Sequence, residues 1–375
     1  MIEAAGAEHA VLHKDAYAYS AHPHLVALED GDWLIVFNKT IRRRLILHPP
    51  QDPEFRNWLM RSSDDGRSWT SPQAVPGYDW HGVECAGLTA LGRGRVMLNQ
   101  WRFRWYPLDV ARRRLDAQSL TFPSRLLRGL ALSPELDIDR ALLADPDSVA
   151  PWARGSGDCF VHFSEDGGRS WGESRRVDCA PYSGGYGMRG ALVLPGGVLL
   201  LPLSDIPNYR IVFVVRSNDL GRSWAAPMAA ASKDGSEFEE PAIIRLASGR
   251  ILMLLRDNGT RRLHRVVSDD DGASWSPPEP TAIEGYPPHL LHLPDGRLLC
   301  TYGWRQPGYG IRAALSADGG QSWDLEREIV IRGAMANKDL GYPCSVVDRD
   351  GAVFTVYYGQ DGDGVTCIQA TRWRL

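Results

Sequence analysis

The sequence predicts an all-β fold, a six-bladed β-propeller whose blades are four-stranded antiparallel sheets. The first observation behind this prediction is an eight-residue pattern, Ser-x-Asp-x-Gly-x-Ser-Trp, which occurs five times, beginning at residues 62, 164, 217, 268 and 316. The second is a pair of apolar runs joined by a Gly turn, which occurs six times. Repeats spaced by about 50 residues are typical of propellers, in which each repeat forms one blade.

The eight-residue pattern predicts a tight turn between two antiparallel strands. Its Asp carboxylate accepts hydrogen bonds from backbone N–H groups of the turn, and its Gly adopts a positive φ without steric strain. Its Trp is expected to bury its ring against the neighbouring blade. Because the same residues recur from blade to blade, we interpret the Asp and the Trp as parts of the scaffold and not as a catalytic acid and a sugar platform.

Each pair of apolar runs predicts a β-hairpin. The six hairpins span residues 22–38, 84–100, 188–204, 240–256, 287–305 and 342–359. The eight-residue pattern follows each of the first five and completes a four-stranded blade. The sixth blade has no such pattern, so the N-terminal run Ala10 to Tyr19 is predicted to supply its fourth strand, which closes the ring and removes exposed edges. One propeller domain is therefore expected over residues 1–375.

Blade two is longer than the other blades by roughly 50 residues. The excess runs from Arg102 to about Gly157 and is expected to be partly helical. It leaves the blade between the second and third strands. Long insertions in compact domains are either functional lids and interfaces or solvated surface segments, and the sequence leaves both readings open.

Composition excludes several classes of function. A net charge of −4 provides no basic surface for nucleic acid, and no stretch is long and apolar enough to span a membrane. Residues 1–10 lack the basic and apolar regions of a signal peptide, and the six Cys lack metal-binding spacing. These features favour a cytoplasmic protein with reduced thiols, without a metal or a nucleic-acid or membrane partner. The oligomeric state stays open.

Polar and ionisable residues gather where the first strand of each blade begins and where the second strand ends. The first strands of a propeller lie next to its axis, so these residues converge on one end of the ring. At the beginnings of the first strands the sequence places His22, His24, Glu84, Arg189, Glu239, Glu240, His289 and Tyr342. At the ends of the second strands it places Asn38, Arg102, Asp205, Arg256, Arg305 and Tyr358. The strand centres are apolar, and this contrast predicts a functional site at that end.

Two segments resemble blades of the sialidases, six-bladed propellers that carry the same eight-residue pattern, the Asp-box. Glu240-Pro-Ala-Ile-Ile-Arg-Leu, followed by Arg256 and the pattern at Ser268, resembles the fourth sialidase blade, in which a Glu opens one strand and an Arg ends the next. Asp-Leu-Gly-Tyr342-Pro-Cys-Ser-Val resembles the last sialidase blade, in which the matching Tyr is the nucleophile.

The resemblance implies an exo-glycoside hydrolase that removes a terminal acidic sugar, with Tyr342 as nucleophile and Glu240 as its base. Sialic acid carries a carboxylate on its anomeric carbon, which repels a carboxylate nucleophile but not a Tyr. Arg256 and Arg305 are then the residues that bind the substrate carboxylate. No cofactor is implied, and the expected ligand is a carbohydrate. Further substrate-binding residues expected at the site are Arg189, His22, His24, Glu84, His289 and, as an alternative to Arg305, Arg312.

The chain departs from the sialidase pattern at two places. Ala21-His22-Pro23 stands where sialidases have Arg-Ile-Pro, so the first of three arginines is absent, and Arg189 or one of Arg42 to Arg44 is left to replace it. The loop over residues 41–55 lacks an Asp at the spacing of the family's general acid. Asp52, Glu84, Asp205 and the histidines all remain open for that role.

Because of these departures the sugar is also open between sialic acid, a related nonulosonic acid, a uronic acid and a neutral sugar. Two alternatives to a sialidase-like hydrolase remain. One is a glycosidase or lyase of the same fold that acts on a uronic or neutral sugar, with Glu84, Glu240 and the histidines as acid–base groups. The other is a propeller that binds glycans without catalysis, since one fold hosts many functions.

Overall fold

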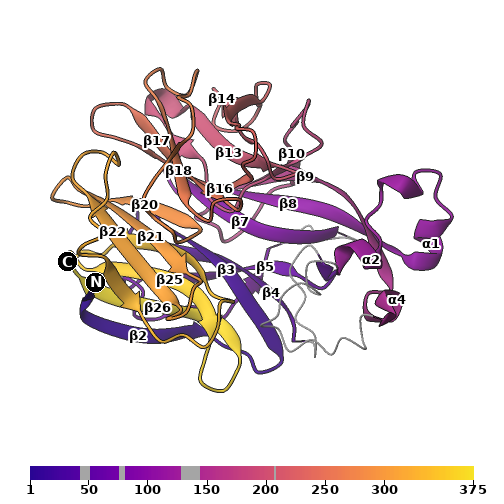
Figure 1. Ribbon diagram of the computed structural model, residues 1–375, viewed down its shortest axis with the longest axis horizontal. Helices are drawn as coiled ribbons and strands as arrows, with labels where there is room; N and C mark the ends of the chain where they lie inside the picture. The colour runs from indigo at the N-terminus through magenta and orange to yellow at the C-terminus, as the bar shows by residue number, and fades with distance from the viewer. Residues whose placement is uncertain (43–50, 76–80, 128–143, 207) are drawn as a thin grey trace.

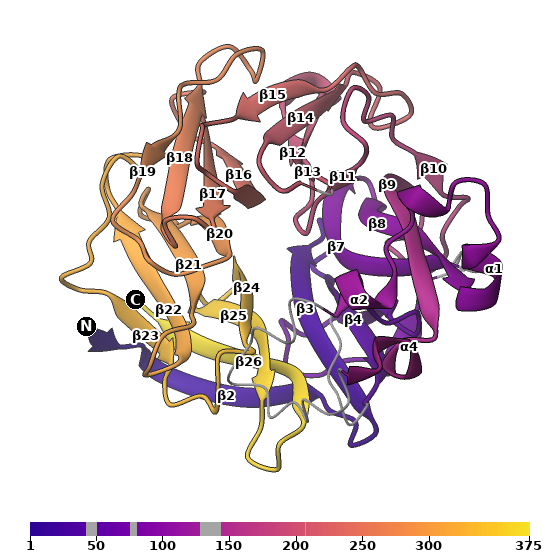
Figure 2. The same cartoon turned by 45° about the vertical axis from the view of Figure 1, so that its right-hand side comes forward.

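The computed structural model consists of six β-sheets arranged in a ring (Figure 2), which confirms the predicted six-bladed β-propeller. It describes residues 1–42, 51–75, 81–127, 144–206 and 208–375. The first strand of each blade lies nearest the axis, and the strands follow one another outward. We call the end of the ring at which these first strands begin the site face.

Blades one to three are built from consecutive strands of the chain, ordered from the axis outward. Blade one consists of β3 (Ala18–Ala27), β4 (Trp33–Ile41), β5 (Arg56–Ser62) and β6 (Gln73–Ala74). Blade two consists of β7 (His81–Gly92), β8 (Arg95–Pro107), β9 (Trp152–Ser164) and β10 (Arg175–Arg176). Blade three consists of β11 (Gly185–Tyr186), β12 (Leu192–Val193), β13 (Leu199–Asp205), β14 (Val212–Ser217) and β15 (Met228–Ala231).

The other three blades continue the ring. Blade four consists of β16 (Phe238–Arg245), β17 (Ile251–Asp257), β18 (Leu263–Ser268) and β19 (Glu279–Pro280). Blade five consists of β20 (Pro288–His292), β21 (Leu298–Trp304), β22 (Gly310–Ser316), β23 (Ile329–Arg332) and β1 (Ile2–Glu3). Blade six consists of β24 (Gly341–Val347), β25 (Val353–Gln360), β26 (Thr366–Arg374) and β2 (Ala5–His13).

The predicted hairpins are present in all six blades, but the prediction of one continuous first strand is wrong for blade three. There β11 and β12 both pair with β13, at Ser204 to Asp205 and at Leu199 to Leu200, and the residues between them leave the ladder. Arg189 lies in this gap and is buried near the axis, where it donates hydrogen bonds to two other blades. The break therefore brings a buried cation to the axis.

The Asp-box turns have the predicted geometry. In the first of them Gly66 has a φ of +79° and donates its N–H to Ser62 Oγ at 2.8 Å, and Ser68 donates its N–H to Asp64 Oδ1 at 2.8 Å. The hydrogen bonds from Ser68 lower the pKa of Asp64 to about 2. The tryptophans of the five turns lie against apolar clusters shared with the preceding blade, as Trp69 does against Phe354 of blade six. Most of the core lies between blades in this way.

The N-terminal segment closes the ring as predicted, but the closing strand begins and ends earlier than the predicted run 10–19 and shares residues 10–13 with it. The fourth strand of blade six is β2, residues 5–13, paired antiparallel with β26, whereas the later part of the predicted run, Ala18 to Tyr19, already belongs to β3 of blade one. In addition β1 pairs in parallel with β23 of blade five. The N-terminal segment therefore pairs with two blades.

The insertion lies between β8 and β9, as predicted. Both strands extend to 13 residues, so the part outside the sheet begins after Pro107 and ends before Trp152, which is shorter than predicted. Its described helices are α1 (Leu108–Arg112), the 3-10 helix η2 (Ala117–Ser119), α2 (Pro123–Leu126) and α4 (Pro146–Val149), and a further 3-10 turn, η4 (Pro195–Gly197), lies in blade three. In Figure 1 the insertion helices lie on the side of the ring opposite the two chain ends. Within the described residues no helix has the length and apolar character needed to cross a membrane.

Candidate functional site

A β-bulge interrupts the first strand at the same point in blades one, four and six. His22, Glu240 and Tyr342 lie at these bulges with φ values of +54°, +53° and +51°. Each stands nine residues before the Gly of the hairpin turn and directly before a Pro. A non-glycine residue in this conformation is destabilising by about 1–3 kcal/mol, and a bulge changes the direction of a side chain. The backbone strain is therefore concentrated at His22, Glu240 and Tyr342, all on the site face.

Tyr342 and Glu240 are hydrogen-bonded to each other across the axis, from blade six to blade four. The Tyr342 hydroxyl donates to Glu240 Oε1, and Arg256 Nη1 donates to Glu240 Oε2 at 2.8 Å. Tyr342 is 6% exposed and Glu240 2% exposed. Burial opposes ionisation of Glu240, but Arg256, the Tyr342 hydroxyl and Arg305 outweigh it and lower its pKa. Glu240 is therefore an ionised acceptor of the Tyr342 proton.

Glu239, next to Glu240 in β16, shares the same arginine. Glu239 Oε1 lies 3.5 Å from Arg256 Nε and accepts a hydrogen bond of 2.5 Å from Asn258 Nδ2. Burial raises the pKa of Glu239, Arg256 opposes the rise, and the charge of Glu240 adds to it. The pKa values of the two carboxyl groups are thus shifted in opposite directions, that of Glu240 down and that of Glu239 up.

Arg256 and Arg305 both contact the ring of Tyr286. The Arg256 guanidinium is 4.3 Å from the centre of the Tyr286 ring, and that of Arg305 is 5.6 Å from the same ring and 5.6 Å from the ring of Tyr342. Arg305 Nε also donates to Leu340 O at 3.0 Å. Cation–π contacts hold both guanidinium groups beside the Tyr342–Glu240 pair.

His22 packs beneath Tyr342. Its ring centre is 4.4 Å from that of Tyr342 and 5.1 Å from that of Tyr358, both in edge-on contacts. The hydroxyls of Tyr358 and Tyr19 donate to Asp339 at 3.0 Å, so one carboxylate fixes two of the rings around the site.

A buried chain of polar side chains runs from His22 into blade two. His22 Nδ1 is 3.2 Å from Asn38 Oδ1, Asn38 Nδ2 donates to Asn57 Oδ1 at 2.6 Å, and Asn57 Nδ2 donates to Gln100 Oε1 at 2.8 Å. Gln100 Nε2 is 2.8 Å from His162 Nε2, and burial lowers the pKa of His162 to about 4. A connected network of this kind fixes the position of its members.

Glu84 lies at the start of blade two, in the register position that Glu239 and Tyr286 occupy in blades four and five. Its Oε2 is buried and has no hydrogen-bond partner among the described residues. Burial raises its pKa to about 8, the nearby Arg154 opposes the rise, and the charges of Glu239 and Glu240 add to it. Glu84 is therefore a protonated carboxyl group at neutral pH, close to the acidic pair of blade four.

Arg189, His24 and His289 lie deeper along the axis. His24 Nδ1 accepts the N–H of Leu88 at 2.9 Å, and His289 Nδ1 accepts that of Ser345 at 3.3 Å. Burial, followed by the charge of Arg189, lowers the pKa of both histidines well below the ordinary value. Arg189 Nη2 donates to Pro288 O at 3.1 Å and Pro343 O at 2.8 Å. The two histidines therefore join neighbouring blades, and Arg189 joins blade three to blades five and six across the axis.

The remaining sequence-predicted residues lie apart from Tyr342. Arg312 is on β22, in an ion pair of 2.8 Å with Glu328 and 3.8 Å from the centre of the Trp304 ring. Asp205 Oδ1 accepts the N–H groups of Arg210 and Ile211, both at 2.7 Å. Asp52 Oδ1 accepts that of Glu54 at 2.9 Å. Arg42 is exposed and donates to Gly364 O at 2.8 Å, whereas Arg43 and Arg44 lie outside the described residues.

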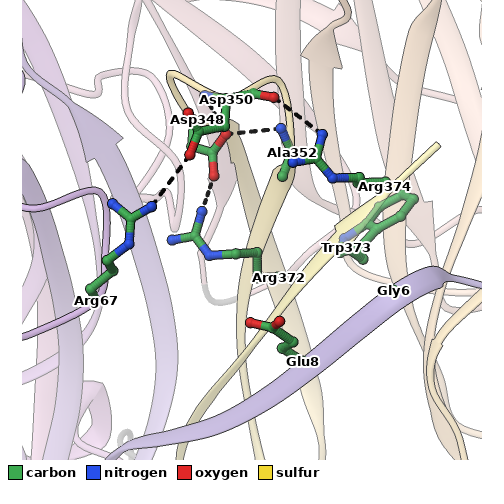
Figure 3. A pocket seen from close by; sticks show the side chains of 9 residues that line it. All are labelled: Gly6, Glu8, Arg67, Asp348, Asp350, Ala352, Arg372, Trp373 and Arg374. Atoms are coloured by element: carbon green, nitrogen blue, oxygen red, sulfur yellow. Dashed lines mark hydrogen bonds and ion pairs between the residues drawn. The ribbon is translucent and has the colours of Figure 1, made fainter.

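A cavity lies away from this site, at the junction of blades one and six near the Asp-box turn of blade one. It measures about 440 Å³ and is lined by residues of β2, β26 and the turn after β24. Figure 3 shows that its charged groups pair with one another: Arg372 with Asp348, and Arg67 with Asp350. These pairs brace the closure of the ring, so we place the functional site at Tyr342 and Glu240 instead.

Sequence analysis missed Tyr286, Asp339 and most of the polar chain from His22. Asn57 and Gln100 carried a usable signal, because each is a polar residue within an apolar strand. Tyr286 had a weaker one, since it stands in the same register position as Glu84 and Glu239. Asp339 precedes its strand, and no pattern in the sequence indicates it as a site residue.

The fold and the site together define a sialidase-like β-propeller. Residues 147–355, more than half of the chain, match the BNR repeat-like domain, and the chain belongs to this family. No curated protein matches the chain.

Among solved structures, a protein of unknown function from Dyadobacter fermentans is 20% identical, with a TM-score of 0.76 over 99% of both chains. The intramolecular trans-sialidase of Ruminococcus gnavus is 14% identical, with a TM-score of 0.64 over 99% of this chain and 97% of that one. The NanB sialidase of Streptococcus pneumoniae is 11% identical, with a TM-score of 0.65 over 97% of this chain and 70% of that one. At sequence identities this low, the likeness shows a shared fold alone.

Proposed function

We propose that this protein is an exo-glycoside hydrolase that removes a terminal acidic sugar, a sialic acid or a related nonulosonic acid. The observation that carries the proposal is the buried hydrogen bond from Tyr342 to Glu240, with Arg256 on the other oxygen of the same carboxylate. An ionised carboxylate bonded to a tyrosine hydroxyl is the arrangement that makes a tyrosine nucleophilic. In addition, two guanidinium groups beside it suit a substrate that carries a carboxylate.

In the proposed reaction the Tyr342 hydroxyl gives its proton to Glu240 and its oxygen attacks the anomeric carbon. The bond from that carbon to the leaving oxygen breaks, and Glu84 supplies the proton that the leaving oxygen needs. A water molecule then attacks the anomeric carbon and gives a proton to Glu84, and Tyr342 leaves and recovers its proton from Glu240. Arg256 and Arg305 bind the substrate carboxylate throughout.

We assign the proton-donor role to Glu84 by comparing the four groups that the sequence left open. Asp205 and Asp52 accept backbone N–H groups in turns, and His24 and His289 accept backbone N–H groups between blades. His22 is held by Asn38 at the start of the buried polar chain. Glu84 is buried near Glu240, and its pKa of about 8 keeps the carboxyl group protonated at neutral pH. A general acid is most effective when its pKa lies near the operating pH.

A uronic acid is the second candidate substrate, and it is favoured by Ala21. This residue is 0% exposed and stands where the sialidase pattern has its first arginine. The site then offers Arg256 and Arg305 to the carboxylate without a third arginine from blade one. A carboxylate in another position on the sugar ring, as in a uronic acid, would be bound by two arginines in a different orientation. Glu84 and Glu240 would then act as the acid–base pair.

Turnover of aryl glycosides by the purified protein tests both candidates. The panel contains an aryl α-sialoside, its deaminated analogue, an aryl β-glucuronide and an aryl α-L-rhamnoside, and the absorbance of an unsaturated product is followed in parallel. Release from either nonulosonate is the expected result. Release from the glucuronide alone would replace it with the second candidate. Binding without release across the panel would show that the protein is a glycan-binding propeller.

A further inference from the structure

A small cavity of about 100 Å³ lies between the insertion, blade two and blade three. Trp101 of β8 and Arg154 of β9 line it from blade two, and Ser183 and Ile206 line it from blade three. Arg125 of α2 and Thr121, which precedes α2, line it from the insertion. We call it the arginine cavity.

Backbone pairing fixes the insertion against this cavity. Thr121 donates its N–H to Arg154 O at 2.7 Å, and Arg154 donates its N–H to Thr121 O at 2.9 Å. This two-bond bridge lies directly before the short helix that carries Arg125. Arg125 and Arg154 therefore come from segments that are joined to each other, and both side chains line the same space.

The cavity carries a positive charge. Burial lowers the pKa of Arg154, and the charge of Arg125 contributes to the same shift, so the two guanidinium groups lie close enough to repel each other. The Arg154 guanidinium is 5.1 Å from the ring of Trp101 and 5.4 Å from that of Phe103, and these contacts fix its position. Two guanidinium groups around one cavity suit a carboxylate or a sulfate.

The arginine cavity adjoins the proposed proton donor. Glu84 pairs with Trp101 in the β7–β8 ladder, and Trp101 lines the cavity. Arg154 also interacts electrostatically with both Glu84 and Tyr209. Since a proton donor must contact the leaving oxygen, the leaving group lies on the side of the site where Glu84 is, which is the side of the arginine cavity.

We propose that the arginine cavity binds the negatively charged group of the sugar on the leaving side of the scissile bond, a carboxylate or a sulfate. The natural substrate then has two acidic sugars in sequence, the terminal one that is removed and a second one that is released with its charge held by Arg125 and Arg154. The order of the two sugars in this inference rests on the proposed function. The affinity of the cavity for an anionic sugar can be measured without turnover.

Binding is measured first, by calorimetry, with methyl β-D-glucuronide, glucose 6-sulfate and the neutral methyl β-D-glucoside. The wild-type protein is expected to bind at least one of the two anionic sugars about tenfold or more tighter than the glucoside, because charge-assisted hydrogen bonds of this kind favour binding by that factor. The comparison of glucuronide with sulfate shows which anion the cavity prefers. Equal binding of all three sugars would refute the proposal.

The variant Arg125→Gln locates the binding. It removes the charge from an exposed side chain of the insertion and leaves the partly buried Arg154 in place. We expect it to weaken anionic-sugar binding about tenfold to a hundredfold. Arg113→Gln is the matched control, because Arg113 is an arginine of the same insertion whose side chain is 72% exposed and pairs with Asp109. Undiminished anionic-sugar binding by Arg125→Gln, or an equal loss in Arg113→Gln, would overturn the assignment.

Turnover separates this proposal from the proposed function. With two substrates that share the terminal sugar, one with an aryl leaving group and one with an acidic sugar as leaving group, Arg125→Gln should lower kcat/KM more for the second. An absence of turnover on both substrates would refute the hydrolase, while charge-dependent binding that is lost in Arg125→Gln would still support the cavity. Turnover with an equal effect on both substrates would refute the leaving-side placement.

Discussion

Glu239 and Glu240 are neighbours in one strand, share the guanidinium of Arg256, and have pKa values shifted in opposite directions. Glu240 receives the closer contact with Arg256 and the Tyr342 hydroxyl, and so it holds the negative charge. The pKa of Glu239 is raised because burial disfavours a second charge beside the first. Arg256 lowers the pKa of both carboxyl groups, and burial outweighs this effect at Glu239 but not at Glu240.

The first prediction compares the two isosteric amides at these positions. Glu239→Gln replaces a carboxyl group whose ionisation burial disfavours, and should change the free energy of unfolding by less than about 1 kcal/mol at pH 7. Glu240→Gln removes a buried charge opposite the partly buried Arg256, and should lower this free energy by about 3–5 kcal/mol and kcat by about 10²–10⁴. Urea denaturation and steady-state kinetics of both variants provide the measurement.

Glu239 and Glu240 also differ in the direction in which pH changes their contribution to the free energy of unfolding. A carboxyl group whose pKa is lowered by folding, such as Glu240, contributes stability that is lost as the pH falls through its folded pKa. Glu239, whose pKa is raised, contributes the opposite slope, and Glu239→Gln should remove it. Equal effects of the two amides on stability would contradict the division of charge.

The second prediction concerns Tyr342. Tyr342→Phe removes the proposed nucleophile but keeps the ring against His22, so turnover should fall by at least about 10³-fold while the fold is retained. Stability should fall by about 1.5–3 kcal/mol, since one hydrogen bond to a charged group is lost. Activity assays and thermal unfolding by circular dichroism give the two readings.

Tyr357→Phe is the control for this variant. Tyr357 is also buried, but its hydroxyl lies 2.8 Å from Thr371 Oγ1 in blade six and away from the site. It should retain turnover near that of the wild-type protein. If Tyr342→Phe retains activity comparable to this control, Tyr342 is not the nucleophile.

The third prediction concerns Glu84. Its pKa is about 8 in the folded protein against 4.5 in the unfolded chain, so the folded state binds the additional proton between these values. The free energy of unfolding of the wild-type protein should therefore fall as the pH rises from about 5 to about 8, and Glu84→Gln should reduce this fall by about 2–4 kcal/mol. Denaturation at a series of pH values measures it.

The same variant tests the proton-donor role. Aryl leaving groups depart without much protonation, whereas sugar leaving groups need a proton. Glu84→Gln should therefore lower kcat/KM about 10²–10⁴-fold for a disaccharide and much less for an aryl glycoside. A loss that does not depend on the leaving group would exclude Glu84 as the general acid.

The fourth prediction concerns His24. Because His24 Nδ1 accepts the buried N–H of Leu88, His24→Leu leaves that donor without its partner. The free energy of unfolding should fall by about 1–3 kcal/mol, with kcat/KM changed by less than about twofold. The exposed His292 provides the control His292→Leu, which should alter stability by less than about 0.5 kcal/mol. A large rise in KM for His24→Leu would instead support substrate contact by this histidine.

The sequence predicts the parts of the site that repeat with the blades. Aligning the blades on the turn Gly placed Glu240 and Tyr342 in one register position, and the structure brings these two side chains together. The sequence also predicts Arg256 at this site, near the end of the next strand of blade four, and the structure pairs Arg256 with Glu240. A single sequence shows the repeat, and the position of a residue within the repeat predicts which end of the ring it occupies.

Contacts between blades are what a single chain does not reveal. Tyr286 belongs to the site because its ring contacts two arginines, one of its own blade and one of blade four. Asp339 belongs to it because two tyrosines of blades one and six donate hydrogen bonds to its carboxylate. Such contacts depend on how neighbouring blades are placed around the axis, and this placement leaves no repeated pattern in the sequence. The boundaries of β2 were wrong for a related reason, since a closing strand takes its register from β26.

The closure of the ring sets an order of events in synthesis. Residues 5–13 pair with β26, whose residues 366–374 are made last among the described strands. At about 5–20 residues per second, β2 waits roughly 20–70 s for its partner on the ribosome. During that interval β2 is an unpaired strand that can pair with other chains. The chain therefore remains open to such pairing until β26 emerges.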